Sequence, residues 1–210
     1  MDLSSQTNAS FHLPETMPVM VLGDCYLFPG CVLPLYIFEE RYRLMLAHAL
    51  QTNRMFCIGT RTQGIDNQGE IVTVSTAGLI RACKKQEDGT SHVMLQGVRR
   101  IRLTGWQQEK PFVLAKIEPM DTVIETEREY LDELKQRCMD LLPDAAASSG
   151  DAMRSLRMTL DQIQCPEIVC DILSYHFVRN ASAQRSLLVE PVLERRYDRL
   201  ISELERSQED

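Results

Sequence analysis

The hydrophobic pattern of this chain changes its period near Asp121, and that change limits what the chain can fold into. Before this point, short apolar runs alternate with glycines, prolines and polar turns, which is typical of β-strands. After it, apolar residues recur about every 3.6 positions, as in amphipathic helices. We therefore predict an α+β protein with a flexible tail over residues 1–15, a β subdomain over 16–120 and a helical bundle over 121–210.

The β subdomain is expected to contain five or six strands and one early helix. The helix is predicted over 39–51, where Tyr42, Leu46 and Leu50 share one face. Gly78 and Gly97 interrupt two apolar runs and indicate bends. These features predict a small, strongly bent sheet or pseudo-barrel. Its main strands are expected at residues 19–22, 55–60, 71–83, 92–106 and 111–120.

Five helices are predicted in the second part, at 124–142, 152–163, 166–178, 183–189 and from Pro191 to about Leu204. Ser182 is the expected N-cap of the fourth of these helices. The Ala- and Ser-rich break at 143–151 is either a hinge or a tight helical connection, and both interpretations remain open.

The 210-residue chain has a net charge of −7, and the acidic excess lies in the second part. Residues 1–120 hold 12 Lys and Arg against 11 Asp and Glu, whereas residues 121–210 hold 11 against 19. The second part repels phosphate, so nonspecific nucleic-acid binding is not expected there. The nearly neutral first part leaves that question open.

Nothing in the sequence predicts a membrane segment or a secretory signal. No apolar run approaches the roughly 18 residues that a spanning helix needs. The N-terminus, MDLSSQTNAS, has neither a basic region nor an apolar core. We expect a cytoplasmic protein whose seven cysteines are reduced thiols.

The sequence also lacks the catalytic and cofactor-binding signatures GxGxxG, HExxH and GxSxG. Gly59 and Gly64 have the spacing of a phosphate-binding loop. However, Ile65 and Asp66 stand where that loop needs Lys and Ser or Thr, so we predict a turn. We therefore expect no catalytic residue, no cofactor and no metal.

An apolar segment at residues 25–38 contains two prolines and a glycine, and it is predicted to be an extended loop with short strand pieces. Two interpretations are open: the segment packs between sheet and helix, or it forms a groove for apolar polypeptide segments. The candidate binding residues are Phe28, Leu33, Leu35, Tyr36 and Phe38.

Basic residues gather in two of the predicted strands. Strand alternation is expected to place Arg100 and Arg102 on one face with Arg81 nearby, and Arg99 on the other face. This surface could bind RNA or an acidic partner, or it could be a solvated face paired with the acidic helices. The absence of aromatic stacking residues in this strand segment favours the second interpretation.

The segment Phe28-Pro29-Gly30-x-x-Leu33-Pro34-Leu35-x-Ile37-Phe38-Glu39-x-Arg41-Tyr42 closely resembles the opening motif of the Lon N-terminal, or Lon substrate-binding, domain. Residues 78–101 and 187–196 look similar to later parts of the same family, so the resemblance covers about residues 15–206. Glu39 is expected to cap the helix or to pair with Arg41 or Arg100. The motif positions are Pro29, Gly30, Pro34, Glu39, Arg41 and Tyr42. For the first four of them an architectural role is favoured.

The resemblance implies a PUA-like pseudo-barrel followed by a helical bundle. In full-length Lon proteases this region precedes an ATPase module and a Ser–Lys protease module, and it helps to recognise unfolded or tagged substrates. The present sequence ends at Asp210, before either module. We therefore expect a stand-alone Lon-domain protein without proteolytic activity.

The predicted function is noncatalytic binding of unfolded or apolar polypeptide segments, in an adaptor or regulator of proteolysis that also contacts a protease or another protein. The alternatives are an RNA-binding PUA-like module that uses the arginine face, and a small-ligand sensor.

Overall fold

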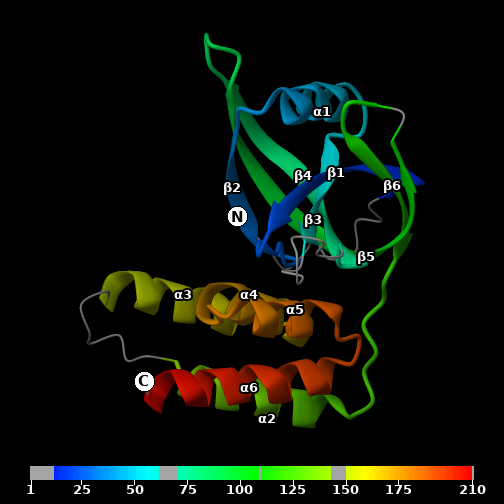
Figure 1. The fold of residues 1–210 in the computed structure, drawn as a ribbon. Helices are drawn as coiled ribbons and strands as arrows, with labels where there is room; N and C mark the ends of the chain where they lie inside the picture. The colour runs from blue at the N-terminus through cyan, green and yellow to red at the C-terminus, as the bar shows by residue number, and fades with distance from the viewer. Residues whose placement is uncertain (1–11, 62–70, 109, 143–149, 210) are drawn as a thin grey trace. The chain divides into compact units, whose positions relative to one another are not determined.

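The computed structural model describes residues 12–61, 71–108, 110–142 and 150–209. They form two compact units that divide after Asp121 (Figure 1). Among the described residues, the first unit holds six strands and one helix, and the second holds five helices. We call them the sheet unit and the helical unit. The predicted α+β class is confirmed.

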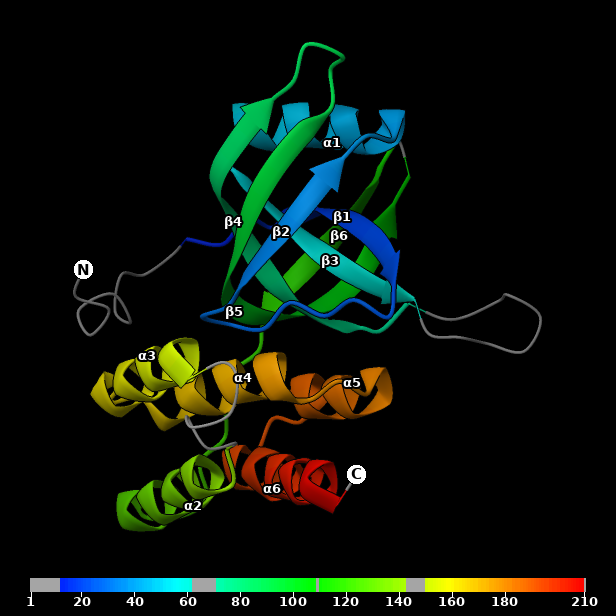
Figure 2. The ribbon, with the colours of Figure 1, turned by 90° about the vertical axis from the view of Figure 1, so that its left-hand side faces the viewer.

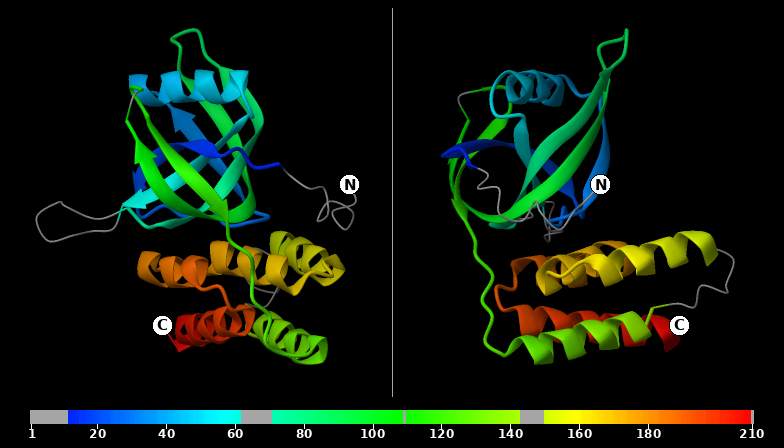
Figure 3. Two further views of the ribbon diagram at one scale, coloured as in Figure 1. Left: turned by 90° about the vertical axis from the view of Figure 1, so that its right-hand side faces the viewer. Right: turned by 180° about the vertical axis from the view of Figure 1, so that it is seen from behind.

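The strands of the sheet unit follow the order β2-β5-β4-β3-β1-β6, and β6 also pairs with β5. This last pairing closes five of the strands into a barrel, whose closing side is visible in Figure 3. The β1–β3 pair is parallel and the other pairs are antiparallel. The elements are β1 (Thr16–Gly23), β2 (Val32–Ile37), α1 (Glu40–Gln51), β3 (Met55–Arg61), β4 (Val74–Lys85), β5 (Ser91–Gln107) and β6 (Val113–Pro119).

Two hydrophobic clusters lie on opposite faces of β1 and β3. Met20 and Phe56 belong to the first cluster, which also contains the buried side of α1 and the N-terminal half of β5. Val19 and Cys57 belong to the second, together with residues of β6 and the C-terminal half of β5. Both faces of these strands are therefore buried, which explains their nearly continuous apolar sequence.

A β-bulge transfers β5 from one cluster to the other. Ala77 lies opposite Arg99 whereas Gly78 lies opposite Gly97, so Val98 is the additional residue. Before the bulge the odd-numbered Leu95 faces the first cluster, and after it the odd-numbered residues face the second. The bend predicted at Gly78 and Gly97 corresponds to this bulge.

A tight turn at residues 28–31 leads into β2. The Cys31 amide donates to the Phe28 carbonyl at 3.2 Å, and Gly30 has a positive φ of 79°. Pro29 before a glycine in this conformation is typical of a type II turn. Gly97 then holds this turn through two backbone hydrogen bonds. Its amide donates to the Cys31 carbonyl, and its carbonyl accepts from the Gly30 amide, both at 2.9 Å. As a result, the segment predicted to be mainly loop forms a six-residue strand beside β5.

The helical unit consists of α2 to α6, and α6 packs against α2, α4 and α5. Tyr197, Leu200, Ile201 and Leu204 form the buried side of α6. The predicted bundle is thus present. Its helices are α2 (Arg128–Asp140), α3 (Gly150–Gln162), α4 (Pro166–Phe177), α5 (Ala181–Val189) and α6 (Leu193–Glu209).

The predicted N-cap of α5 is wrong. Asn180, rather than Ser182, caps this helix, and its side-chain oxygen accepts from the Ala183 amide at 2.9 Å. Ser182 lies inside the helix. Asn and Ser are both good N-caps, so residue type alone does not identify which of the two caps the helix.

A fully buried ion pair joins two helices of this unit. The Arg196 guanidinium on α6 lies 3.3 Å from the Asp171 carboxylate on α4, and neither side chain reaches solvent. Arg196 also donates to the Thr122 hydroxyl at 2.6 Å. Arg196 therefore connects the start of the helical unit, at Thr122, with α4 and α6.

Some sequence predictions lie partly or wholly outside the described residues. They are most of the flexible tail over 1–15, the polar turn after Gly59 with its phosphate-loop-like spacing, and nearly all of the break at 143–151.

We predict that Gly97→Ala destabilises the sheet unit. An added Cβ would lie 2.2 Å from the Phe28 carbonyl oxygen, and a clash with backbone costs about 1–3 kcal/mol. Gly105→Ala is the matched control, because its Cβ would meet only ordinary contacts at 3.6 Å and beyond. Urea unfolding followed by the fluorescence of Trp106 checks this. Equal midpoints for the two variants would contradict the close approach.

We also predict that Arg196→Met destabilises the helical unit by about 3–5 kcal/mol, because it removes the cation beside a fully buried carboxylate. The double variant Arg196→Met/Asp171→Leu should recover most of this loss, since it removes both charges. Urea unfolding followed by far-UV circular dichroism measures both. If the double variant is as unstable as the single one, the buried pair is not the cause.

Candidate functional site

The two faces of β2 have different environments. Leu33, Leu35 and Ile37 face inward and pack against the first hydrophobic cluster. Val32, Pro34 and Tyr36 alternate with them and are exposed. The strand therefore displays apolar side chains on its solvent side as well as on its buried side, where polar residues are more usual.

The exposed side chains of β2 continue across β5 and β4 in rows set by the strand register. Tyr36 lies opposite His92, which lies opposite Lys84, and Pro34 lies opposite Met94, which lies opposite Ala82. In a third row, Val32 lies opposite Gln96, and Arg81 donates a hydrogen bond to Gln96. Figure 2 looks onto these three strands. We call the surface formed by these nine residues and Phe38 the outer β face.

Aromatic rings cover one end of the outer β face. The rings of Tyr36 and Phe38 stack with centroids 5.8 Å apart, and His92 lies 5.0 Å from Tyr36. Tyr36 is 48% exposed, Phe38 59% and Met94 42%. Single exposed apolar side chains are normal, whereas larger contiguous patches of them mark interaction surfaces.

A shallow open groove of about 390 Å³ lies on this face. It is mainly apolar, and Lys84 and His92 supply its polar groups. Its lining residues are Pro34, Leu35, Tyr36, Ala82, Cys83, Lys84, His92, Val93 and Met94.

The structure separates the five binding residues suggested by the sequence. Phe28 is fully buried, and Leu33 and Leu35 pack inward, although Leu35 also reaches the groove. Tyr36 and Phe38 are on the surface. Phe28 and Leu33 are therefore removed from the candidate site, because the turn and the strand alternation direct them into the core.

Sequence reasoning missed Val32 and Met94 as site residues. Val32 belongs to the period-two set of Pro34 and Tyr36, so alternation within residues 32–37 could have identified it. Met94 lies about sixty positions from β2 in the sequence, and only the register of β2 on β5 brings it opposite Pro34.

The other motif residues hold α1 in place. Glu39 precedes the helix without a side-chain cap and forms an ion pair with Arg41 at 2.7 Å, one of the two partners predicted for it. Tyr42 is buried and donates to the Val21 carbonyl at 2.7 Å. The guanidinium of Arg41 lies 4.5 Å from the centre of the Tyr42 ring. Burial raises the pKa of the Tyr42 hydroxyl, which therefore stays protonated as a donor.

The predicted arginine face is not a single surface. Arg100 is 3% exposed and lies opposite the buried Thr76, whereas Arg81 and Arg102 are exposed. The bulge at Val98 reverses the alternation of β5, so Arg102 lies on the opposite side of the sheet from the outer β face. Arg100 and Arg102 share a face, as strand alternation predicts, but Arg81 does not join them. The prediction failed for Arg81 because it assumed an uninterrupted pleat.

Two core cysteines of the sheet unit, Cys25 and Cys57, are poor nucleophiles at neutral pH. Burial raises the pKa of Cys25, and it raises that of the fully buried Cys57 to about 12. A thiol reacts as its thiolate, so both residues are chemically quiet.

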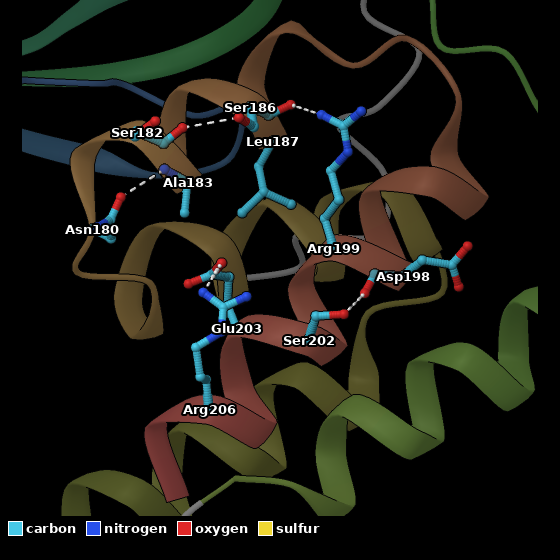
Figure 4. A pocket seen from close by; sticks show the side chains of 10 residues that line it. All are labelled: Asn180, Ser182, Ala183, Ser186, Leu187, Asp198, Arg199, Ser202, Glu203 and Arg206. Carbon is cyan, nitrogen blue, oxygen red and sulfur yellow. Dashed lines mark hydrogen bonds and ion pairs between the residues drawn. The ribbon is translucent and has the colours of Figure 1, made fainter. Parts of the chain in front are cut away.

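A larger groove of about 740 Å³ lies between α5 and α6 (Figure 4). Its polar side chains already interact with one another. Arg199 donates to the Ser186 carbonyl at 2.9 Å and pairs with Glu190, and Arg206 pairs with Glu203 at 2.8 Å. These contacts account for the two arginines within the helical unit, so we do not regard this groove as the site.

The described part of the chain offers neither a metal-binding cluster nor a membrane-spanning helix. Within it, no group of three or more His, Cys, Asp or Glu side chains could hold a metal ion. None of its helices combines the length and apolarity that crossing a bilayer requires.

The architecture is that of Lon N-terminal domains. The N-terminal domain of a Lon protease from the Mycobacterium avium complex superposes with a TM-score of 0.70 at 16% identity, covering 90% of this chain and 98% of that one. A Lon N-terminal domain protein from Xanthomonas campestris gives a TM-score of 0.60 at 21% identity, covering 89% of this chain and 97% of that one.

The sequence agrees with the fold. Residues 16–206 match the family described as the ATP-dependent protease La (LON) substrate-binding domain, and the chain belongs to this family. The Lon protease of Desulfosudis oleivorans is 31% identical over 107 residues, 49% of this chain. That of Dictyoglomus thermophilum is 20% identical over 185 residues, 87% of this chain. The chain spans 13% and 23% of the lengths of these two proteases.

The burial pattern predicts a large loss of stability for the substitution of one phenylalanine of the motif and almost none for the other. Phe28→Ala should lower the free energy of unfolding by about 3–5 kcal/mol, because it empties a fully buried site. Phe38→Ala should change it by about 0.5 kcal/mol or less, because this ring is exposed. Urea unfolding followed by Trp106 fluorescence compares them. A large loss for Phe38→Ala would show that its ring supports the fold.

Proposed function

We propose that the sheet unit binds polypeptide segments on its outer β face without catalysing a reaction. One observation carries the proposal: Val32, Pro34, Tyr36, Phe38 and Met94 form an exposed, contiguous apolar surface in a domain of the Lon substrate-binding family. Membership of this family supports substrate recognition by the domain, and the surface offers a place for it.

The character of this surface favours weak and sequence-tolerant binding. The groove is shallow and open, so it accommodates side chains of several shapes. The unbranched side chain of Met94 adapts to different partners. Segments that are buried in folded proteins expose such apolar side chains when they unfold, so unfolded clients are the proposed ligands.

RNA is the weaker alternative. The three arginines that suggested it do not share a surface, because Arg100 is buried and Arg81 and Arg102 lie on opposite sides of the sheet. Aliphatic side chains such as Val32, Pro34 and Met94 contribute little to the binding of a nucleotide. A polypeptide uses the aliphatic and the aromatic parts of the face together.

Within this proposal, the chain acts as an adaptor or regulator of proteolysis. A module that holds an unfolded segment can present it to a protease or keep it from one. The domain then contributes recognition, and any hydrolysis belongs to its partner.

The test is fluorescence polarisation with a labelled, permanently unfolded polypeptide. Tyr36→Ser/Phe38→Ser should weaken binding about tenfold or more, because each buried aromatic ring contributes about 1–3 kcal/mol. Trp106→Ser is the matched control, since Trp106 is 46% exposed on the same unit but lies outside the outer β face. The control should bind like the unmodified chain.

Unchanged binding by a folded Tyr36→Ser/Phe38→Ser chain would refute the assignment of the face. Far-UV circular dichroism and the unfolding midpoint establish that the variant is folded. Absence of polypeptide binding by the unmodified chain would refute the proposed function itself.

A further inference from the structure

The outer β face has an apolar side and a basic side. Its β2 column consists of Val32, Pro34 and Tyr36, whereas its β4 column contains Arg81 and Lys84 on either side of Ala82. On β5, His92 lies between the aromatic ring of Tyr36 and the ammonium group of Lys84. The charge is therefore not spread evenly over this face but lies along its β4 side.

The cations of the β4 column are available to a ligand. Arg81 donates to the neutral Gln96 amide, and none of the ion pairs formed within the described residues involves Arg81 or Lys84. Other exposed arginines of this unit are already neutralised, as shown by Arg41 with Glu39 and Arg99 with Asp121. The acidic residues of the β4–β5 hairpin, Glu87 and Asp88, lie in its turn rather than on this face.

We propose that the outer β face prefers polypeptide segments in which an apolar cluster is followed by acidic residues. This inference rests on the proposed function and adds a charge selectivity to it. The apolar side chains of the segment pack on Tyr36, Pro34 and Met94. Its carboxylates lie beside Lys84 and Arg81.

The register sets the spacing that such a segment needs. From β2 to β4 the distance is two strand spacings, about 10 Å. An extended chain advances about 3.3 Å per residue and its side chains alternate, so only every second residue faces the surface. A carboxylate on the same side as the apolar anchor therefore lies two or four residues from it, about 7 or 13 Å away, and these two distances bracket the separation of β2 and β4. The favoured pattern is therefore an aromatic or aliphatic residue with Asp or Glu two or four residues after it.

The two halves of the pattern contribute differently. Exposed ion pairs are weak, and salt screens them further. Burial of apolar surface must therefore supply most of the affinity, and the cations choose among segments that already have it. The preference for acidic segments should therefore decline as the ionic strength rises. The binding that comes from apolar contacts should persist at high salt.

Two labelled synthetic peptides test the inference by fluorescence polarisation. They share one apolar core of tyrosine, valine and leucine and differ in carrying aspartates or lysines two and four residues beyond it. The unmodified chain should bind the aspartate peptide about three- to tenfold more tightly at low salt, as expected for one or two exposed ion pairs. Arg81→Glu/Lys84→Glu should reverse this preference.

Arg102→Glu/Lys116→Glu is the matched control. It makes the same change in net charge on the same unit, at two exposed cations outside the outer β face. The control should keep the preference for the aspartate peptide. Reversal in both double variants would attribute the effect to net charge and overturn the inference.

The remaining outcomes separate this inference from the function on which it rests. Equal binding of both peptides, unaffected by Arg81→Glu/Lys84→Glu, would overturn the charge selectivity while leaving polypeptide binding intact. If neither peptide nor the unfolded polypeptide binds, the proposed function fails as well. If a single-stranded RNA displaces the aspartate peptide, and if Arg81→Glu/Lys84→Glu abolishes the binding of that RNA, the inference is overturned in favour of nucleic acid.

Discussion

The approach of Gly97 to the carbonyl of Phe28 determines how the sheet unit displays its surface. A side chain at position 97 could not be accommodated, because a Cβ would lie 2.2 Å from that oxygen. The contact holds the turn at residues 28–31 against β5 through two backbone hydrogen bonds. It therefore fixes the register of β2, and the register decides which residues of the apolar segment are buried. A shift of one residue would exchange the two faces of the strand.

With this register, one short segment serves both the core and the surface. Leu33, Leu35 and Ile37 stabilise the fold from the inner side of β2, whereas Val32, Pro34 and Tyr36 remain in contact with water. Packing is thus observed for one set of alternate residues, and binding is proposed for the other set of the same strand. Stability does not require the outward set to be apolar, and the proposed contact with a polypeptide gives a reason for its composition.

The sequence predicted the order of elements well, because strand and helix periods are local properties. It predicted surfaces less well, because these depend on pairing between distant segments. One additional residue at Val98 reverses the alternation of β5 and separates Arg81 from Arg102. Likewise, Met94 joins the site only through its register with Pro34. The family motif indicated the fold, but it did not distinguish the buried Phe28 from the exposed Phe38.

The central claim is that the outer β face, rather than the helical unit, contacts the polypeptide. Methyl-labelled methionine NMR tests it most directly, because Met94 is 42% exposed on this face and Met158 is 65% exposed on α3. During titration with an unfolded polypeptide, the Met94 methyl signal should shift or broaden while the Met158 signal stays unchanged. A response of Met158 with an unchanged Met94 would contradict the account and move recognition to the helical unit.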